Sequence, residues 1–164
     1  MPVDPADFRR ALGQFAAGVT VVTTRDAQGR SLGLTVTAFA SVSLEPPLVL
    51  VCVDHRSEAH AGFRHAGLFG VSILAEEQEE VSRRFAVGGA AKFKGLELAT
   101  GSTGVPLIPG ALAHLECRVS GMHVAGDHTI YVGEVLSVDV RPGRPLLYHD
   151  RGYRRLAAGE EPAE

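Results

Sequence analysis

The chain has 164 residues, of which 45% are hydrophobic and 21% are charged, and its formal net charge is −3. These values are typical of one globular domain with a core of its own, and the small negative charge disfavours general nucleic-acid binding. The longest apolar run, near LVLVCV, is too short to cross a bilayer. The first ten residues lack the pattern of a secretion signal, and two cysteines, Cys52 and Cys117, are too few for a disulfide framework, so we expect a cytoplasmic protein.

An amphipathic helix is predicted over residues 5–16. An Asp-Pro pair at positions 4 and 5 is a typical N-cap and first helical position, and apolar residues recur at helical spacing from Phe8. Gly18 should end this helix. The β-branched run VTVVTTR then predicts a strand at 19–25, followed by a hairpin turn at 26–30.

The chain is expected to return through LGLTVTAFASVS as a strand over 32–43. Pro46 and Pro47 interrupt the pattern before LVLVCV, whose continuous apolar run predicts a strand at 48–53 that is buried on both faces. The further expected elements are a helix that begins at Ser57 and carries Phe63 inward, a strand at 68–74, a helix at 75–86, a loop at 88–110, long strands at 111–123 and 128–140, a strand pair within 145–156, and a disordered tail at 157–164.

Strands outnumber helices in this reading, and the two kinds of element do not alternate in the regular βαβ manner. A doubly wound parallel sheet is therefore disfavoured. The pattern favours a mainly β fold, a closed antiparallel barrel with a few peripheral helices, formed by a single domain over residues 1–156.

The sequence lacks the motifs of several reaction classes. No HExxH or paired CxxC motif is present, and His55, His60 and His65 lie five apart, so on a helix they would turn away from one another. These patterns argue against a metal site. Neither a GxSxG elbow nor an SxxK pair suggests a nucleophile, and the Rossmann and P-loop glycine motifs are missing.

One segment could bind a flat ligand without such motifs. Hydroxyl residues occupy alternate positions, so on a strand they would share a face; they are Thr35, Thr37, Ser41 and Ser43. This face is either exposed to solvent or a polar edge for a hydrogen-bonding ring, which the small Ala38 and Ala40 would let approach the main chain. Ser57 at a helix start could bind a phosphate. The basic residues that could assist, or could simply be solvated, are Arg83, Arg84 and Lys92.

The tripeptide Gly126-Asp127-His128 stands directly before a predicted strand. Gly-Asp is common turn chemistry, so the tripeptide is either a turn or the rim of a site that uses the imidazole of His128. The residues alone leave both interpretations open.

Six segments in this order resemble the flavin reductase-like family: FAAGVTVVTT, TVTAFASVSLEPPLVLVCV, GVSILAEEQEEVSRRFA, KFKGLEL, GDHTIYVGEV and PLLYHDRGYRRL. The resemblance spans about residues 8–156. Members of this family are small FMN-binding split barrels, and many are the reductase components of two-component flavin-dependent monooxygenases. The resemblance implies a homodimer that oxidises NADH or NADPH, reduces FMN or FAD, and supplies the reduced flavin to a separate monooxygenase.

The resemblance also implies site residues. His128 matches the catalytic histidine that the family places near the nicotinamide. The cofactor-binding residues that it implies are Thr37, Ala38, Ser41, Asp54, Ser57, Arg84, Phe85, Lys92, Tyr148 and Tyr153. The first three are expected along the flavin ring, the next five near its ribityl chain and phosphate, and the two tyrosines close to the nicotinamide. Lys92 stands where an arginine is common, so its phosphate contact would lack bidentate geometry.

Two other functions are compatible with the same barrel. One is an FMN-dependent oxidase of the pyridoxamine-phosphate oxidase type, although no separate basic cluster for a phosphorylated substrate is evident. The other is a non-enzymatic flavin or haem carrier, although no CxxCH haem-attachment site is present. The sequence does not decide between FMN and FAD or between NADH and NADPH, and it does not identify the partner monooxygenase.

Overall fold

The computed structural model describes residues 2–157 and residue 159, so the tail predicted at 157–164 lies almost wholly outside the described residues. The helices are α1 (Pro5–Leu12), α2 (His60–Ala66), α3 (Glu79–Phe85) and the 3-10 helix η1 (Ala90–Phe93). The strands are β1 (Ala17–Gly18), β2 (Thr20–Arg25), β3 (Ser31–Val36), β4 (Phe39–Leu44), β5 (Pro47–Asp54), β6 (Leu68–Ile73), β7 (Ala99–Thr100), β8 (Pro106–Leu107), β9 (Ala113–Ala125), β10 (His128–Val140), β11 (Leu147–His149) and β12 (Gly152–Arg154).

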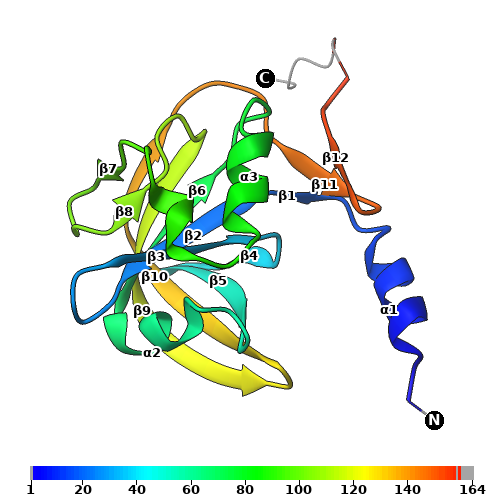
Figure 1. The fold of residues 1–164 in the computed structure, drawn as a ribbon, viewed down its shortest axis with the longest axis horizontal. Coiled ribbons are helices and arrows are strands. Elements are labelled where there is room, and N and C mark those ends of the chain that lie inside the picture. The colour runs from blue at the N-terminus through cyan, green and yellow to red at the C-terminus, as the bar shows by residue number, and fades with distance from the viewer. Residues whose placement is uncertain (1, 158, 160–164) are drawn as a thin grey trace.

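Seven strands form one antiparallel sheet in the order β3-β2-β6-β9-β10-β5-β4, and this sheet curls into a barrel (Figure 1). The barrel interior is filled by a cluster of buried side chains that includes Val22, Val51, Phe63, Phe69 and Tyr131. Full burial of one such apolar side chain contributes roughly 1.5–3 kcal/mol. The predicted mainly β barrel with peripheral helices is confirmed.

A second core lies outside the barrel, where α3 and the C-terminal hairpin β11–β12 pack near β2. Val21 points into this second core, together with Phe85 and Leu146, whereas Val22 points into the barrel. β2 is therefore buried on both faces. This second core fixes α3 next to β2 and β3, while β11 of the hairpin pairs with β1.

The barrel is split between its two edge strands, β3 and β4. These strands are consecutive in sequence, and Thr37 and Ala38 carry the chain from one edge to the other. The single strand predicted over 32–43 is therefore wrong. The expected common face of four hydroxyls is wrong as well: Thr35 on β3 donates to Ser82 O at 2.6 Å, whereas Ser41 lies on the opposite edge, next to a bulge in β4.

The predicted burial of residues 48–53 on both faces is also wrong. Side chains of β5 alternate between buried and half-buried, and Val49, Val51 and Val53 form the buried set. The outward set is apolar too, which explains why the sequence shows no alternation. An apolar outer face on this strand must be covered by something other than the barrel interior.

The N-terminal helix is shorter than the predicted 5–16, and Gly18 lies in β1 rather than ending it. Asp4 caps the helix as expected, by accepting from Ala6 N at 2.8 Å. The helix ends near Gly13 in a tighter turn, where Gln14 N and Phe15 N donate three residues back to Ala11 O and Leu12 O at 3.1 Å, and Gly13 O accepts from Asp150 N at 2.8 Å. α1 stands apart from the barrel in Figure 1, and none of its residues is buried.

The other elements follow the sequence with smaller differences. α2 begins at His60 rather than Ser57, because Ser57 Oγ accepts from Ala59 N at 3.2 Å in a preceding turn. α3 is shorter than 75–86, since the side chain of Gln78 accepts from Ala75 N and closes a turn before it. The loop predicted at 88–110 also holds η1 and the short β7–β8 pair. The two long strands and the C-terminal strand pair are confirmed.

Candidate functional site

One face of β4, β5 and β10 turns away from the barrel interior and carries small or apolar side chains. Leu50 on β5 lies opposite Ala40 on β4 and Val132 on β10. Two residues further along β5, Cys52 lies opposite Ile130. Paired residues point to the same side of a sheet, so these side chains form one surface, which we call the shelf. The shelf residues, all half-buried or exposed, are Ala38, Ala40, Leu50, Cys52, Ile130 and Val132.

Charged and polar groups lie at the end of the shelf, where β5 ends and β10 begins. Asp54 is the register partner of His128, and Asp127 Oδ1 lies 2.7 Å from His128 Nδ1. Arg56 pairs with Asp54 at 2.7 Å. Hydrogen bonds from Arg56 hold the pKa of the Asp54 carboxyl well below its usual range, and the hydrogen bond from His128 lowers the pKa of Asp127. Both carboxylates are therefore charged at neutral pH.

The free edge of β3 borders the split on the other side. Lys92 Nζ donates to Gly33 O at 3.0 Å, so the main-chain groups of Gly33 point away from β2. Main-chain groups two residues apart on a strand point the same way, and those of Thr35 therefore also face the split. This edge offers backbone donors and acceptors that no strand of the main sheet uses.

A cavity of about 290 Å³ lies beside this edge. Lys92 lines it from η1 and Glu58 lines it from the turn before α2. Glu58 Oε2 accepts from Gly89 N at 2.8 Å, which ties that turn to the loop preceding η1. Burial lowers the pKa of Lys92, while Glu58 opposes this change. The charged residues that line the cavity are thus the cationic Lys92 and Arg30 and the anionic Glu58.

The residues predicted on α3 and the C-terminal hairpin form a separate group. The guanidinium of Arg84 donates to two carbonyls, Ala91 O and Lys94 O, and so holds η1 in place. Phe85 is 1% exposed and packs against Phe93 in the second core, which leaves only its main chain for a ligand. Tyr153 belongs to this group through its hydroxyl, which lies 2.7 Å from Ser82 Oγ.

Tyr148 lies across the hairpin from Tyr153, with the two rings 5.3 Å apart between centroids. Both rings are half-buried, and Arg83 lies over the ring of Tyr153 at 4.8 Å. A pair of partly exposed rings beside α3 can contact an aromatic ligand. The structure connects this pair to the β3 edge through Ser82, which accepts from Thr35.

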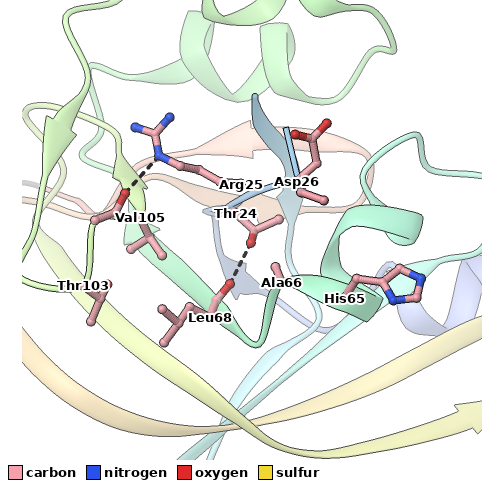
Figure 2. Close-up of a pocket in the computed structure, with 10 residues that line it drawn as sticks. Thr24, Arg25, Asp26, His65, Ala66, Leu68, Thr103 and Val105 are labelled. Atoms are coloured by element: carbon pink, nitrogen blue, oxygen red, sulfur yellow. Dashed lines mark hydrogen bonds between the residues drawn. The ribbon is translucent and has the colours of Figure 1, made fainter. Parts of the chain in front are cut away.

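A second cavity, of about 320 Å³, lies away from all the predicted site residues. Figure 2 shows that two of its polar groups already have partners: Thr24 Oγ1 donates to Leu68 O at 2.7 Å, and Arg25 Nε donates to Gly104 O at 3.0 Å. Asp26 is bonded to Arg30 at 2.7 Å. The geometry therefore favours the shelf and the split over this cavity as the functional site.

The structure thus brings Ala38, Asp54 and His128 together on or beside the shelf, with Thr37 at the crossover. It places Ser41 opposite the buried Val49, outside the shelf face. It places Lys92 at the β3 edge. The edge strands β3 and β4 both belong to the one seven-stranded sheet that forms the barrel (Figure 1).

Sequence reasoning missed the outward residues of β5 and β10. Cys52 is two residues from Asp54 and Ile130 is two residues from His128, so each lies on the same face of its strand as a residue that was predicted. It also missed a contact between two histidines. His55 is not on a helix, and it meets His60 with ring centroids 4.7 Å apart. The expectation that these histidines turn away from one another is therefore wrong.

Within residues 2–157 and 159, no cluster of three or more His, Cys, Asp or Glu side chains is arranged to hold a metal ion. Over the same residues, none of the helices combines the length and the apolar character needed to span a membrane. Cys52 and Cys117 are both free thiols, and burial raises the pKa of Cys117 to about 12.

Comparison with known proteins gives consistent matches. The flavin reductase-like domain model matches residues 12–157. An NADH-dependent flavin reductase from Rhodococcus sp is 45% identical over 156 residues, which cover 94% of this chain and 88% of the relative. The reductase subunit of a flavin-dependent monooxygenase from Rhodococcus jostii is 41% identical over 161 residues, covering 98% and 80% of the two chains.

Solved structures agree with these sequence matches. The NADH:FAD oxidoreductase of Streptomyces globisporus, in complex with NAD and FAD fragments, superposes with a TM-score of 0.89 at 39% identity and covers 98% of this chain and 99% of its own. Nitrilotriacetate monooxygenase component B from Mycobacterium thermoresistibile superposes with a TM-score of 0.90 at 38% identity, covering 97% and 90%. The chain belongs to the flavin reductase-like family.

Proposed function

We propose that this chain is an NADH-dependent flavin reductase that supplies reduced FMN or FAD to a separate monooxygenase. The observation that carries the proposal is the shelf: a flat, largely apolar outer surface beside the split of the barrel, with polar groups at its rim. The curated relatives named above support the same activity, since one is an NADH-dependent flavin reductase and another a monooxygenase reductase subunit.

The shelf fits a planar heterocycle. The side chains of Ala38 and Ala40 are small, so a ring can approach the main chain, and Leu50, Cys52 and Ile130 offer apolar contact. Burial of apolar area contributes roughly 25 cal/mol per Å². The free main-chain groups of the β3 edge supply the hydrogen bonds that the polar rim of such a ring needs.

A bound flavin supplies an electrophilic ring nitrogen that accepts hydride from a nicotinamide, so the protein need not provide a nucleophile. The residues of the chain then have the task of positioning. Correct alignment of two bound reactants can lower the activation barrier of the reaction by roughly 7–11 kcal/mol. This role agrees with the lack of a nucleophile motif in the sequence.

We assign the nicotinamide contact to His128. Its Nδ1 lies 2.7 Å from a carboxylate oxygen of Asp127. A carboxylate only accepts hydrogen bonds, so Nδ1 carries a proton, and in the neutral form of the ring Nε2 is then an acceptor. An acceptor at this position suits the NH₂ group of a nicotinamide carboxamide. Tyr148 and Tyr153 are assigned to the same ligand.

We assign the phosphate end of the flavin to Lys92 and the turn at Ser57, with Arg84 and Phe85 supporting η1 and the β3 edge. Asp54 is charged at neutral pH and would repel a phosphate. It therefore suits the ribityl hydroxyls, which can donate hydrogen bonds to a carboxylate. Thr37 and Ser41 remain proposed contacts at the crossover and on β4.

We further propose that the enzyme is a homodimer. Phe8, Leu12 and Phe15 of the N-terminal segment are 55%, 58% and 78% exposed, and α1 stands clear of the barrel (Figure 1). An isologous dimer would cover these side chains with the same surface of a second copy. The two free cysteines are consistent with a reducing cytoplasm, where we place the enzyme.

The activity is tested by anaerobic oxidation of NADH or NADPH with FMN, FAD or riboflavin, followed at the flavin absorbance. We expect flavin reduction that depends on NADH. Reduction of none of the three flavins would contradict the proposal. The supply of reduced flavin is tested by dialysis: protein that retains one flavin per chain and reduces no added flavin cannot serve a separate enzyme.

A further inference from the structure

Two histidines converge on a single hydroxyl group next to the proposed site. His55 Nε2 lies 3.0 Å from Thr129 Oγ1, and His60 Nε2 lies 3.1 Å from the same oxygen. Thr129 is 5% exposed and points into the barrel end. The buried ring of Tyr131 lies 6.4 Å from that of His60 between centroids, and among the residues that the structure describes the Tyr131 hydroxyl has no hydrogen-bond partner.

These contacts attach a short segment of chain to β10. The segment runs from Asp54 to His60 and includes Ser57, to which we assign the flavin phosphate. Its first part is tied by the main-chain bond from His55 N to Asp127 O at 3.0 Å. The two imidazoles tie both ends of the segment to Thr129, which directly follows His128.

The two imidazoles share the hydroxyl of Thr129, and the hydrogen bonds that it can make depend on their protonation. It carries one hydrogen and two lone pairs, so it can donate to one neutral imidazole and accept from the other. If both imidazoles are protonated, neither can accept its hydrogen, and two positive charges face each other across a ring distance of 4.7 Å. Protonation of both imidazoles would therefore leave the Thr129 hydrogen without an acceptor on either ring and add like-charge repulsion, so the arrangement is most stable while at least one imidazole is neutral.

The surroundings of His60 favour its neutral form. Burial lowers the pKa of His60, and the nearby His55 and Arg64 lower it further, while Asp54 opposes them. Tyr131 faces the ring from β10, and burial raises the pKa of its phenol, so it stays neutral. For a histidine whose pKa is lowered by folding, the native state binds fewer protons than the unfolded state. Its contribution is complete above the ordinary pKa of 6.5 and is lost as the pH falls below that value.

We propose that His55 and His60 are positioning residues that hold the Asp54–Ser57 segment in its flavin-binding arrangement while at least one of them is neutral, and release it when both are protonated. This inference rests on the proposed function, because the segment matters only if it binds flavin. Flavin affinity should therefore fall in weakly acidic solution, because of two residues that do not touch the flavin.

The test compares FMN affinity of the wild type and His60→Gln at pH 7.5 and pH 5.5, by quenching of flavin fluorescence. Glutamine can donate and accept hydrogen bonds but does not titrate. The phosphate of FMN itself titrates near pH 6. This change affects both proteins equally, so it cancels in the ratio of the wild-type dissociation constant to that of His60→Gln at the same pH. We expect a ratio near one at pH 7.5 and about fivefold weaker binding by the wild type at pH 5.5.

Two further variants separate positioning from general stability. His65→Gln lies on the same helix away from Thr129, and it should follow the wild type at both pH values. Thr129→Val removes the shared hydroxyl, and it should bind FMN about fivefold more weakly than the wild type already at pH 7.5. If the ratio of the FMN dissociation constants of wild type and His60→Gln is the same at both pH values, this inference is overturned and the proposed function is not affected. Failure of the wild type to bind FMN at pH 7.5 overturns the proposed function with it.

Discussion

Replacement of Lys92 by methionine tests the assignment of the phosphate end of the flavin. Lys92 Nζ donates to Gly33 O at 3.0 Å beside a cavity of about 290 Å³. Methionine keeps most of the apolar stem and removes the charge. The neighbouring Lys94→Met is the matched control, because Lys94 is exposed and does not line the cavity.

The expected size of the effect follows from the exposure of the side chain. A hydrogen bond to a charged group contributes roughly 1.5–3 kcal/mol, and the half-buried Lys92 should lie at the lower end because water screens its charge. About 1.4 kcal/mol corresponds to a factor of ten. We therefore expect Lys92→Met to weaken FMN binding about tenfold.

Riboflavin, which lacks the phosphate, provides the internal comparison. Isothermal titration with FMN and with riboflavin should show the tenfold loss for FMN and little change for riboflavin, and Lys92→Arg should retain FMN affinity. Equal losses for both flavins would show that Lys92 acts only by supporting the β3 edge. Unchanged FMN affinity would remove the residue from the site.

Three other expectations follow from the structure. His128→Ala should raise the KM for NADH about fivefold, the value of one lost hydrogen bond, with FMN affinity unchanged; equal stopped-flow reduction rates and KM values in both proteins would leave His128 as a turn residue only. Glu116→Gln should lower the free energy of unfolding by about 3 kcal/mol, because two hydrogen bonds from Thr103 lose a charged acceptor. The burial of Glu116 alone would raise its pKa, but the hydrogen bonds of Ser102 and Thr103 outweigh this effect and lower the pKa. The difference in the free energy of urea unfolding between wild type and variant should therefore be full above the ordinary pKa of 4.5 and shrink below it. A difference that does not depend on pH would contradict this reasoning. Leu12→Asp should convert the proposed dimer to monomer in light scattering, whereas a monomeric wild type would refute the dimer.

Local patterns predicted the fold well where they alone decide the structure. β9 and β10 are long alternating strands joined by a Gly-Asp turn, and the sequence gives them within two residues at each end. The resemblance to a family implied a split barrel, but the position of the split could not be predicted from local patterns, because nothing local marks Thr37 and Ala38 as the crossover between two sheet edges. That crossover is set by the closure of the barrel.

The site was predictable to a similar extent. The resemblance to a family selected Asp54 and His128, which the structure indeed places side by side. The shelf was hidden because β5 is apolar on both faces, so its outward residues look like core. The meeting of His55 and His60 on Thr129 joins segments about 70 residues apart, and no spacing rule applied to a helix could reveal it.

The central claim is that the shelf beside the split holds the flavin ring. A crystal structure of the protein with FMN tests it most directly. We expect the ring against Ala38, Ala40 and Cys52, with the phosphate near Lys92. A ring bound in the cavity of Thr24 and Arg25, or anywhere else with the shelf covered by protein, would contradict the claim.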